Sequence, residues 1–106
     1  MTAPACTLAI AGELSIYRAA ELAQSLAQWH AHSSGTDTHL RLDLSEVTEM
    51  DSAGLQLLLS LVRSTQQAGQ TLVIYAPSEA VTEVLDTAGA HPFFTLEAAT
   101  DAPSTL

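Results

Sequence analysis

Residues 48–62, with the sequence TEMDSAGLQLLLSLV, place side chains that could do chemistry directly before a run of leucines. Asp51, Ser52 and Gly54 stand where the leucine-rich helix is expected to begin. An acid and a hydroxyl at such a position allow three interpretations. They could cap the helix, they could include a nucleophilic serine, or the serine could be kept accessible so that another protein modifies it.

Helix capping is the simplest of the three, because an Asp51 or Ser52 oxygen can accept hydrogen bonds from free N–H groups of the first turn. However, the preceding segment SEVTEMD, which we read as a loop, already supplies several capping side chains. Gly54 lowers helix propensity by about 1 kcal/mol relative to alanine, which indicates a close approach at that position. A phosphate on a serine at a helix N-terminus would also lie beside free N–H groups and the positive end of the dipole. The helix should therefore tolerate a phosphoserine.

A catalytic serine is less well supported. MDSAG lacks the first glycine of the Gly-x-Ser-x-Gly turn that exposes a nucleophile. The base would have to be one of four histidines without a recognisable context, His30, His32, His39 and His91. His30 and His32 are two residues apart and diverge on a helix, so they make no metal pair. Without lysine there is also no Gly-x-x-x-x-Gly-Lys phosphate loop. We therefore predict no catalytic residue, no metal site and no cofactor, and expect a protein that is not an enzyme.

Composition narrows the range of partners. The 106 residues include twelve acids against three arginines, for a formal charge of −9. Such a chain cannot neutralise a row of phosphates, which argues against nucleic acid and against anionic membrane surfaces. The leucine-rich stretch is interrupted by Ser60 and Arg63 and is too short to insert into a bilayer. The N-terminal stretch has no basic region typical of a signal peptide, and Cys6 is the only cysteine. We expect a cytoplasmic protein.

The elements that would position Ser52 alternate between strand and helix patterns. Strand patterns occupy CTLAIAG, ending at Gly12, and then residues 39–44, 71–76 and 93–96. Helix patterns run from Arg18 to about His30, from Ser52 to Ala68, and from Pro77 to Gly89, with residues 32–38 as a loop. The apolar stripe of the first helix comprises Ala19, Leu22, Ala23, Leu26 and Trp29, and the inner face of the last comprises Ala80, Val81, Val84, Leu85 and Ala88. Short connections of this kind imply right-handed crossovers and a mainly parallel sheet. The sequence predicts one small α/β domain over residues 1–96, with 97–106 as a flexible tail.

The two faces of the central helix are predicted at 100° per residue. The face expected to lie on the sheet comprises Leu55, Leu58, Leu59 and Val62. The opposite face comprises Gln56, Ser60, Arg63 and Gln67, with Leu57 and Leu61 at the margin. This outer face carries a single charge, which fits either a tolerated polar surface or a surface on which a protein partner docks. Periodicity leaves both interpretations open.

Residues 42–94 resemble a STAS domain of the bacterial anti-sigma-factor-antagonist type. The resemblance is strongest in Asp43-Leu44-Ser45, Val47 and Asp51-Ser52-Ala53-Gly54-Leu55, and AVTEVLDTAG at 80–89 is similar to the family's later helix. It extends back to GEL at 12–14. Few residues precede Gly12, so the family's first strand should be shortened or absent. The implied fold is a small, mostly parallel or mixed sheet of four to five strands with helices mainly on one face.

The resemblance implies a non-enzymatic, partner-switching module. Its partners would be a serine kinase that is also an anti-sigma factor, or a chemotaxis kinase of the GHKL type, and a serine phosphatase. Ser52 would be the phosphorylated residue. The partner-binding surface would be the start of the helix and the segment before it, which we assign to Asp51, Ser52, Ala53, Gly54, Gln56, Leu57 and Ser60.

Two further observations bear on this prediction. Ser15 stands where many family members have an aspartate after Gly-Glu-Leu, and the stretch ELSIYRAAEL at 13–22 is similar to single-domain members associated with chemotaxis. STAS domains also serve as cytoplasmic tails of anion transporters and as accessory subunits of phospholipid-transport ABC systems. The accessory subunit, which does not depend on phosphorylation, is the alternative function.

Overall fold

The computed structural model describes residues 6–33 and 39–98, apart from the side chains of Cys6 and Ser33. Its elements follow the order β1 (Cys6–Leu14), α1 (Ala19–Ser33), β2 (His39–Met50), α2 (Ser52–Gln67), β3 (Thr71–Tyr75), α3 (Glu79–Ala88), a 3-10 turn η1 (His91–Phe93) and β4 (Thr95–Glu97). The predicted tail begins too early, because Glu97 belongs to β4, and residues 99–106 lie outside the described residues. Residues 34–38 of the predicted loop also lie outside them.

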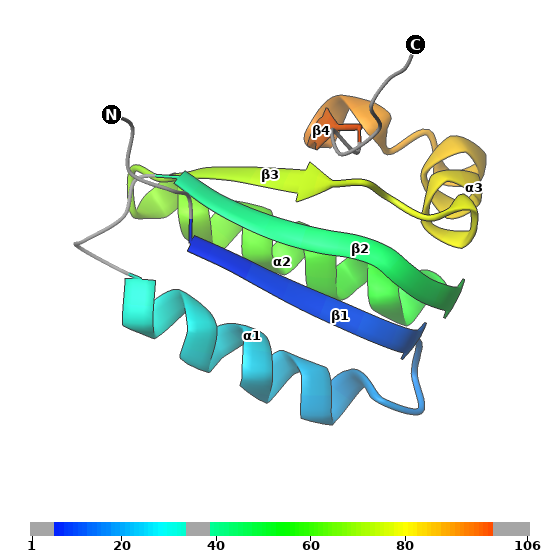
Figure 1. Cartoon of the computed structure of the whole chain (residues 1–106), viewed down its shortest axis with the longest axis horizontal. Coiled ribbons are helices and arrows are strands. Elements are labelled where there is room, and N and C mark those ends of the chain that lie inside the picture. Colours follow the sequence, from blue (N-terminus) through cyan, green and yellow to red (C-terminus); the bar gives the residue numbers. More distant parts are fainter. Residues whose placement is uncertain (1–5, 34–38, 99–106) are drawn as a thin grey trace, which may run out of the picture.

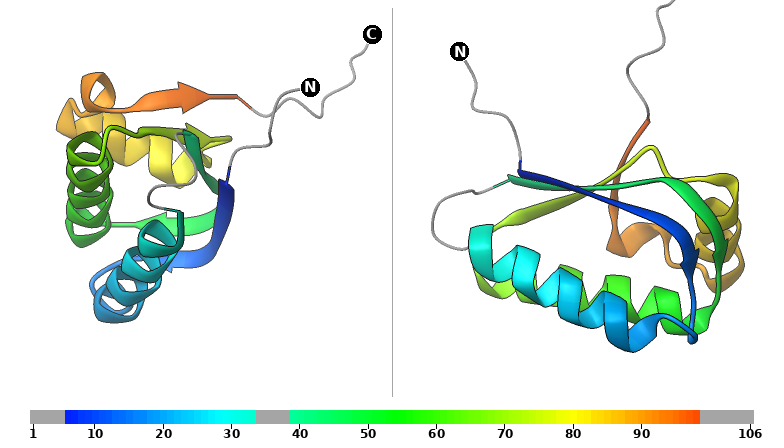
Figure 2. Two further views of the ribbon diagram at one scale, coloured as in Figure 1. Left: turned by 90° about the vertical axis from the view of Figure 1, so that its left-hand side faces the viewer. Right: turned by 60° about the horizontal axis from the view of Figure 1, so that its bottom comes forward.

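The sheet has four strands in the order β1-β2-β3-β4, and every neighbouring pair is parallel (Figure 1). Right-handed crossovers between successive parallel strands bring the connecting helices to one side of a sheet. Accordingly, α1 and α2 run side by side below the sheet in the second view of Figure 2. α3 packs on β2 and also touches α2. The predicted α/β fold, with a small parallel sheet and helices mainly on one face, is confirmed.

The predicted loop SEVTEMD is wrong, because all but its last residue belong to β2. Two register shifts in the β1–β2 pairing each insert one extra residue into β2. Ala9 and Ala11 pair with Asp43 and Glu46, and Gly12 and Glu13 pair with Val47 and Glu49. Extra residues of this kind bend a strand and interrupt its alternation of faces. The strand therefore continues to the start of α2 although its sequence no longer alternates.

The core lies between the sheet and its helices. β2 contributes three leucines with no exposed surface, Leu40, Leu42 and Leu44, and β3 contributes Leu72 and Ile74. Further buried residues come from β1, α1, α2 and α3: Ile10, Leu14, Leu22, Leu26, Leu58, Val81 and Leu85. On the opposite sheet face, the guanidinium of Arg41 lies 4.8 Å from the centre of the Tyr75 ring and 3.3 Å from a Glu97 carboxylate oxygen. β3 lies between β2 and β4 in the sheet, and the described helices cover one of its faces.

The predicted buried face of α2 is correct at Leu55 and Leu58 and needs correction elsewhere. Leu61, placed at the margin, is 5% exposed, whereas Leu59 and Val62 are only half-buried. The reason is that α2 packs on α1 as well as on the sheet, which rotates its apolar contacts toward Leu61. Gln56, Arg63 and Gln67 are exposed as predicted.

Helices α1 and α3 also follow their predicted patterns in part. In α1, Leu22 and Leu26 are buried but Ala23 is exposed. In α3, Ser78 is the N-cap and Gly89, with φ +63°, ends the helix as predicted. Val81 and Leu85 are buried, while Ala88, expected on the inner face, is exposed.

Candidate functional site

The N-terminus of α2 is capped by Asp51 and begins at Ser52. Asp51 has an extended backbone, and its Oδ1 accepts a hydrogen bond from the Gly54 N–H at 3.1 Å. The first helical bond runs from the Leu55 N–H to the Asp51 carbonyl. Ser52, the first residue of the helix, is exposed. Since Asp51 supplies the cap, the Ser52 hydroxyl is available for another purpose.

The Asp51 carboxylate also fixes a second segment. Its Oδ2 accepts a hydrogen bond from the backbone N–H of Ile16 at 3.0 Å, across 35 residues of sequence. The Ile16 and Gly54 N–H groups, in that order, hold the pKa of Asp51 below its usual value of 3.8, because they stabilise the carboxylate form. One side chain thus joins the turn after β1 to the start of α2.

Gly54 is buried, and its missing side chain has a structural cause. A Cβ at this position would lie 2.2 Å from the carbonyl oxygen of Leu14 and 3.0 Å from its carbonyl carbon. That same carbonyl accepts a hydrogen bond from the Asp51 N–H at 3.3 Å. The close approach predicted at Gly54 therefore exists, but the neighbour is the backbone of β1.

Ser15, which replaces the aspartate of many family members, orders the turn that follows β1. Its side chain donates a hydrogen bond to Glu13 at 2.8 Å and accepts one from the Tyr17 N–H at 3.3 Å. The Ser15 carbonyl accepts a further bond from the Arg18 N–H at 3.0 Å. Ser15 itself is only 5% exposed. It shapes this surface without forming part of it.

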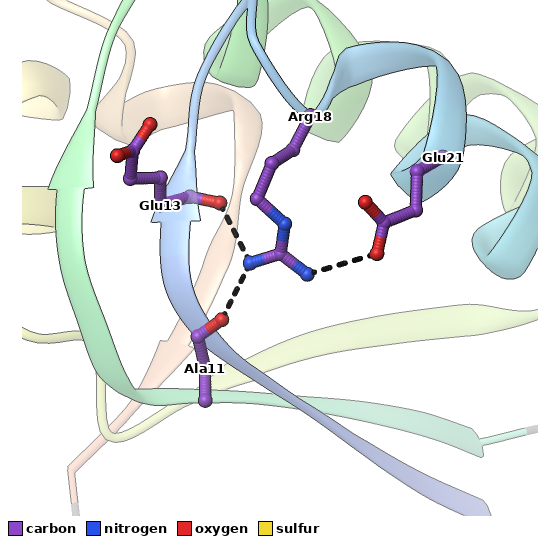
Figure 3. A network of polar contacts seen from close by, with 4 residues as sticks. All are labelled: Ala11, Glu13, Arg18 and Glu21. Carbon is purple, nitrogen blue, oxygen red and sulfur yellow. Dashed lines mark hydrogen bonds and ion pairs between the residues drawn. The ribbon is translucent and has the colours of Figure 1, made fainter.

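Arg18 closes the same turn against the outer edge of β1. Figure 3 shows one guanidinium nitrogen donating to the carbonyls of Ala11 and Glu13, at 2.7 and 3.1 Å, while the other lies 3.3 Å from a Glu21 carboxylate oxygen. Gly12, with φ +85°, leaves room for this arrangement, since a Cβ there would lie 3.2 Å from the arginine nitrogen. The guanidinium thereby ties α1 and its leading turn to the strand.

A groove of about 400 Å³ opens beside Ser52, between α2 and α3. Its apolar floor comes from Leu55, Val84 and Ala88, and polar groups at its rim include Asp51, Ser52, Glu83 and Thr87. A partner that reaches Ser52 would therefore meet an apolar depression bordered by carboxylates.

The predicted partner-binding residues differ in accessibility. Ser52, Gln56 and Ser60 are exposed, and Asp51, Ala53 and Leu57 are half-buried. Leu57 and Ser60 line a second depression of about 290 Å³ between α1 and α2, away from the Ser52 groove. Buried Gly54 can influence a partner only indirectly, by letting α2 begin close to Leu14.

The histidines considered as general bases have other neighbours. A His30 ring nitrogen lies 2.8 Å from the Gln70 side-chain oxygen, and a His91 ring nitrogen lies 2.5 Å from an Asp86 carboxylate oxygen. Over residues 6–33 and 39–98, no three His, Cys, Asp or Glu side chains converge as metal ligands. In the same ranges, no helix combines the length and apolar character needed to cross a membrane.

A family model described as "Mlab, STAS domain" matches residues 1–96. The chain is a STAS domain. Two curated relatives, the anti-sigma-B factor antagonists of Listeria monocytogenes and Listeria innocua, are each 29% identical over 80 residues, which cover 76% of this STAS domain and 68% of the relative. The predicted membership of the STAS family is thereby confirmed, and both relatives bear the name of the predicted type.

Solved structures share the fold of this STAS domain at lower identity. A crystal structure of a Thermotoga maritima protein assigned as an anti-sigma factor antagonist has a TM-score of 0.72 at 21% identity, over 88% of this chain and 78% of its own. The anti-sigma factor antagonist SpoIIAA in its unphosphorylated form has a TM-score of 0.62 at 18% identity, over 92% and 79%.

Several residues of this STAS domain surface were not identified from the sequence. Ile16 and Tyr17 are exposed on the turn held by Asp51, and Glu83 and Val84 line the groove beside Ser52. Glu83 and Val84 lie on a helix of the same α/β unit, but only the three-dimensional packing of α3 on α2 brings them to Ser52. The apolar pair in an otherwise polar turn was the available signal for Ile16 and Tyr17.

Proposed function

We propose that this STAS domain is a non-enzymatic, partner-switching regulator in the cytoplasm whose binding is controlled by phosphorylation of Ser52. The observation that carries the proposal is that two adjacent residues at the start of α2 have separate roles. Asp51 caps the helix, and Ser52 presents an exposed hydroxyl at its first position. The partners would be a GHKL-type serine kinase acting as an anti-sigma factor, or a chemotaxis kinase, together with a serine phosphatase.

The fold should tolerate the phosphate. A phosphoserine carries about −1.5 to −2 charges at pH 7, and the positive end of the α2 dipole can stabilise that charge. An arginine beside Ser52 could pair with the phosphate, but all three arginines lie away from it. Arg18 is engaged by the β1 edge, Arg41 lies on the far sheet face, and Arg63 stands about 16 Å further along α2 at 1.5 Å per residue.

The partner interface should not tolerate a phosphate on Ser52. A kinase has to bring nucleotide phosphates to the Ser52 hydroxyl, so a phosphoserine would face like charges there. The added dianion would also lose its hydration against whatever covers Ser52, with the Asp51 carboxylate adding repulsion close by. The expected result is loss of binding without loss of structure.

The relatives support the same function. Two of them are named as anti-sigma-B factor antagonists, a name that implies a protein partner. The structure of SpoIIAA is described as its unphosphorylated form, which indicates that SpoIIAA has a phosphorylated one. That protein and this STAS domain share the fold.

The test compares Ser52→Asp with Ser52→Ala. Each is measured for melting temperature and for affinity to purified GHKL-type serine kinases of the organism that carries the gene. We expect near-native melting for both, with binding lost only in Ser52→Asp. Equal affinity of the two variants would contradict phosphorylation control and favour the accessory subunit of a phospholipid transporter.

A further inference from the structure

Two large apolar side chains project into solvent from adjacent positions beside the Ser52 site. Among the described residues, Ile16 is 65% and Tyr17 is 88% exposed, and the other exposed large apolar side chains are Phe93 and Leu96. Single exposed apolar residues are common on protein surfaces. An adjacent pair at the site of a proposed interface calls for a specific explanation.

The backbone that carries this pair is held in place. The Ile16 N–H is bound to Asp51, and the Tyr17 N–H is bound to the Ser15 hydroxyl. On the other side, the Arg18 N–H is bound to the Ser15 carbonyl. The chain thus uses three hydrogen bonds to fix a turn that leaves two apolar side chains in water. Such preorganisation lowers the entropy lost when a partner orders the turn.

The turn and Ser52 belong to one surface. The carboxylate that binds the Ile16 N–H belongs to Asp51, the residue directly before Ser52. A partner large enough to cover the serine hydroxyl and the start of α2 would also reach this turn. Tyrosine is among the residues most often found at the energetic centre of protein interfaces, because it buries a large area at low entropic cost.

Carboxylates surround the turn that carries Ile16 and Tyr17, and they indicate the charge that the partner's surface should have. Glu13 and Glu49 pair across β1 and β2 at the end of the sheet that leads into the turn, and Asp51 follows one residue after β2 ends. Arg18, the basic residue of this region, is occupied by backbone carbonyls and Glu21. A basic rim around an apolar pocket would complement both features.

We infer that Ile16 and Tyr17 form the apolar anchor by which the partner kinase holds this STAS domain, inserted into a hydrophobic pocket with a basic rim. The inference rests on the proposed function and deepens it, because it separates the residues that hold the partner from Ser52, which releases it.

The experiment measures the affinity of purified GHKL-type serine kinases for the double variant Ile16→Ser, Tyr17→Ser. The matched control is Phe93→Ser, which removes a side chain that is 63% exposed on η1, outside the turn. We expect the double variant to bind about 30-fold or more weakly, as hot-spot residues do, and the control to bind like the wild type. Wild-type affinity should fall with added salt, as a basic rim requires. All variants should melt near the wild-type temperature, because the replaced side chains are exposed.

Three results would overturn the anchor: unchanged affinity of the double variant, an equal loss in Phe93→Ser, or no binding of the wild type to any of these kinases. Measuring Ser52→Asp in parallel separates the two proposals. If Ser52→Asp binds like the wild type while the double variant is weak, the anchor holds and phosphorylation control fails. If Ser52→Asp alone loses binding, phosphorylation control of Ser52 is supported and the proposed anchor is refuted.

Discussion

Replacement of Gly54 by alanine sets two effects of opposite sign against each other. Alanine in a helix is favoured over glycine by about 1 kcal/mol. The added Cβ would lie 2.2 Å from the Leu14 carbonyl oxygen, whereas ordinary contacts begin near 3.4 Å, so α2 and β1 would have to separate by about 1.2 Å. Overpacking of this kind costs about 1–3 kcal/mol or more. Taking the upper value, because the obstacle is backbone, the net destabilisation is about 2 kcal/mol.

Thermal melting followed by circular dichroism measures this effect. For a domain of this size, about 2 kcal/mol lowers the melting temperature by about 10 °C. Ser64→Ala, at an exposed position on the same helix, gains helix propensity without a clash and should melt at or slightly above the wild-type temperature. If Gly54→Ala melted as high as the wild type and lost only partner binding, the glycine would serve the partner, and the internal-packing explanation would be refuted.

Two further outcomes are expected. Leu58→Ala, which truncates a side chain with no exposed surface, should cost about 2–5 kcal/mol, whereas Gln56→Ala on the exposed face should leave the urea midpoint nearly unchanged; equal effects would contradict the assigned orientation of α2. Asp51→Asn should retain a capping oxygen but lose the carboxylate whose pKa lies below 3.8, so the wild type should be the more stable protein at neutral pH. That advantage should disappear as the pH falls through the lowered pKa of Asp51, and a difference in melting temperature that persisted in strong acid would contradict this role.

The sequence predicted the α/β fold and the core residues Leu55 and Leu58, because both follow from local periodicity and short connections. It misassigned Leu61 and Leu59, since a helical wheel shows which side chains share a face but not which neighbours cover it. Packing of α1 on α2 decides that question. Ala23 in α1 and Ala88 in α3 were also misplaced, since periodicity put both on inner faces and both are exposed.

The end of β2 was missed because its two extra residues break the alternation on which strand prediction depends. Val47 returns to the interior while Ser45 and Glu46 are both exposed. At the site, Asp51 and Ser52 were identified from their residue types, but the neighbour of Gly54 was not. A glycine in a first helical turn signals crowding, and only the three-dimensional path of β1 shows that Leu14 causes it.

The guanidinium of Arg18 has a consequence for self-association. β1 is an edge strand, and an edge with free carbonyls is a template on which another chain can add a strand and begin to aggregate. Arg18 already occupies the carbonyls of Ala11 and Glu13, so an incoming strand would find no acceptors there. A Cβ at Gly12 would lie 3.2 Å from the Arg18 nitrogen, so the guanidinium would have to shift by a few tenths of an ångström to accommodate it. Loss of the Arg18 side chain would leave both carbonyls open to an incoming strand.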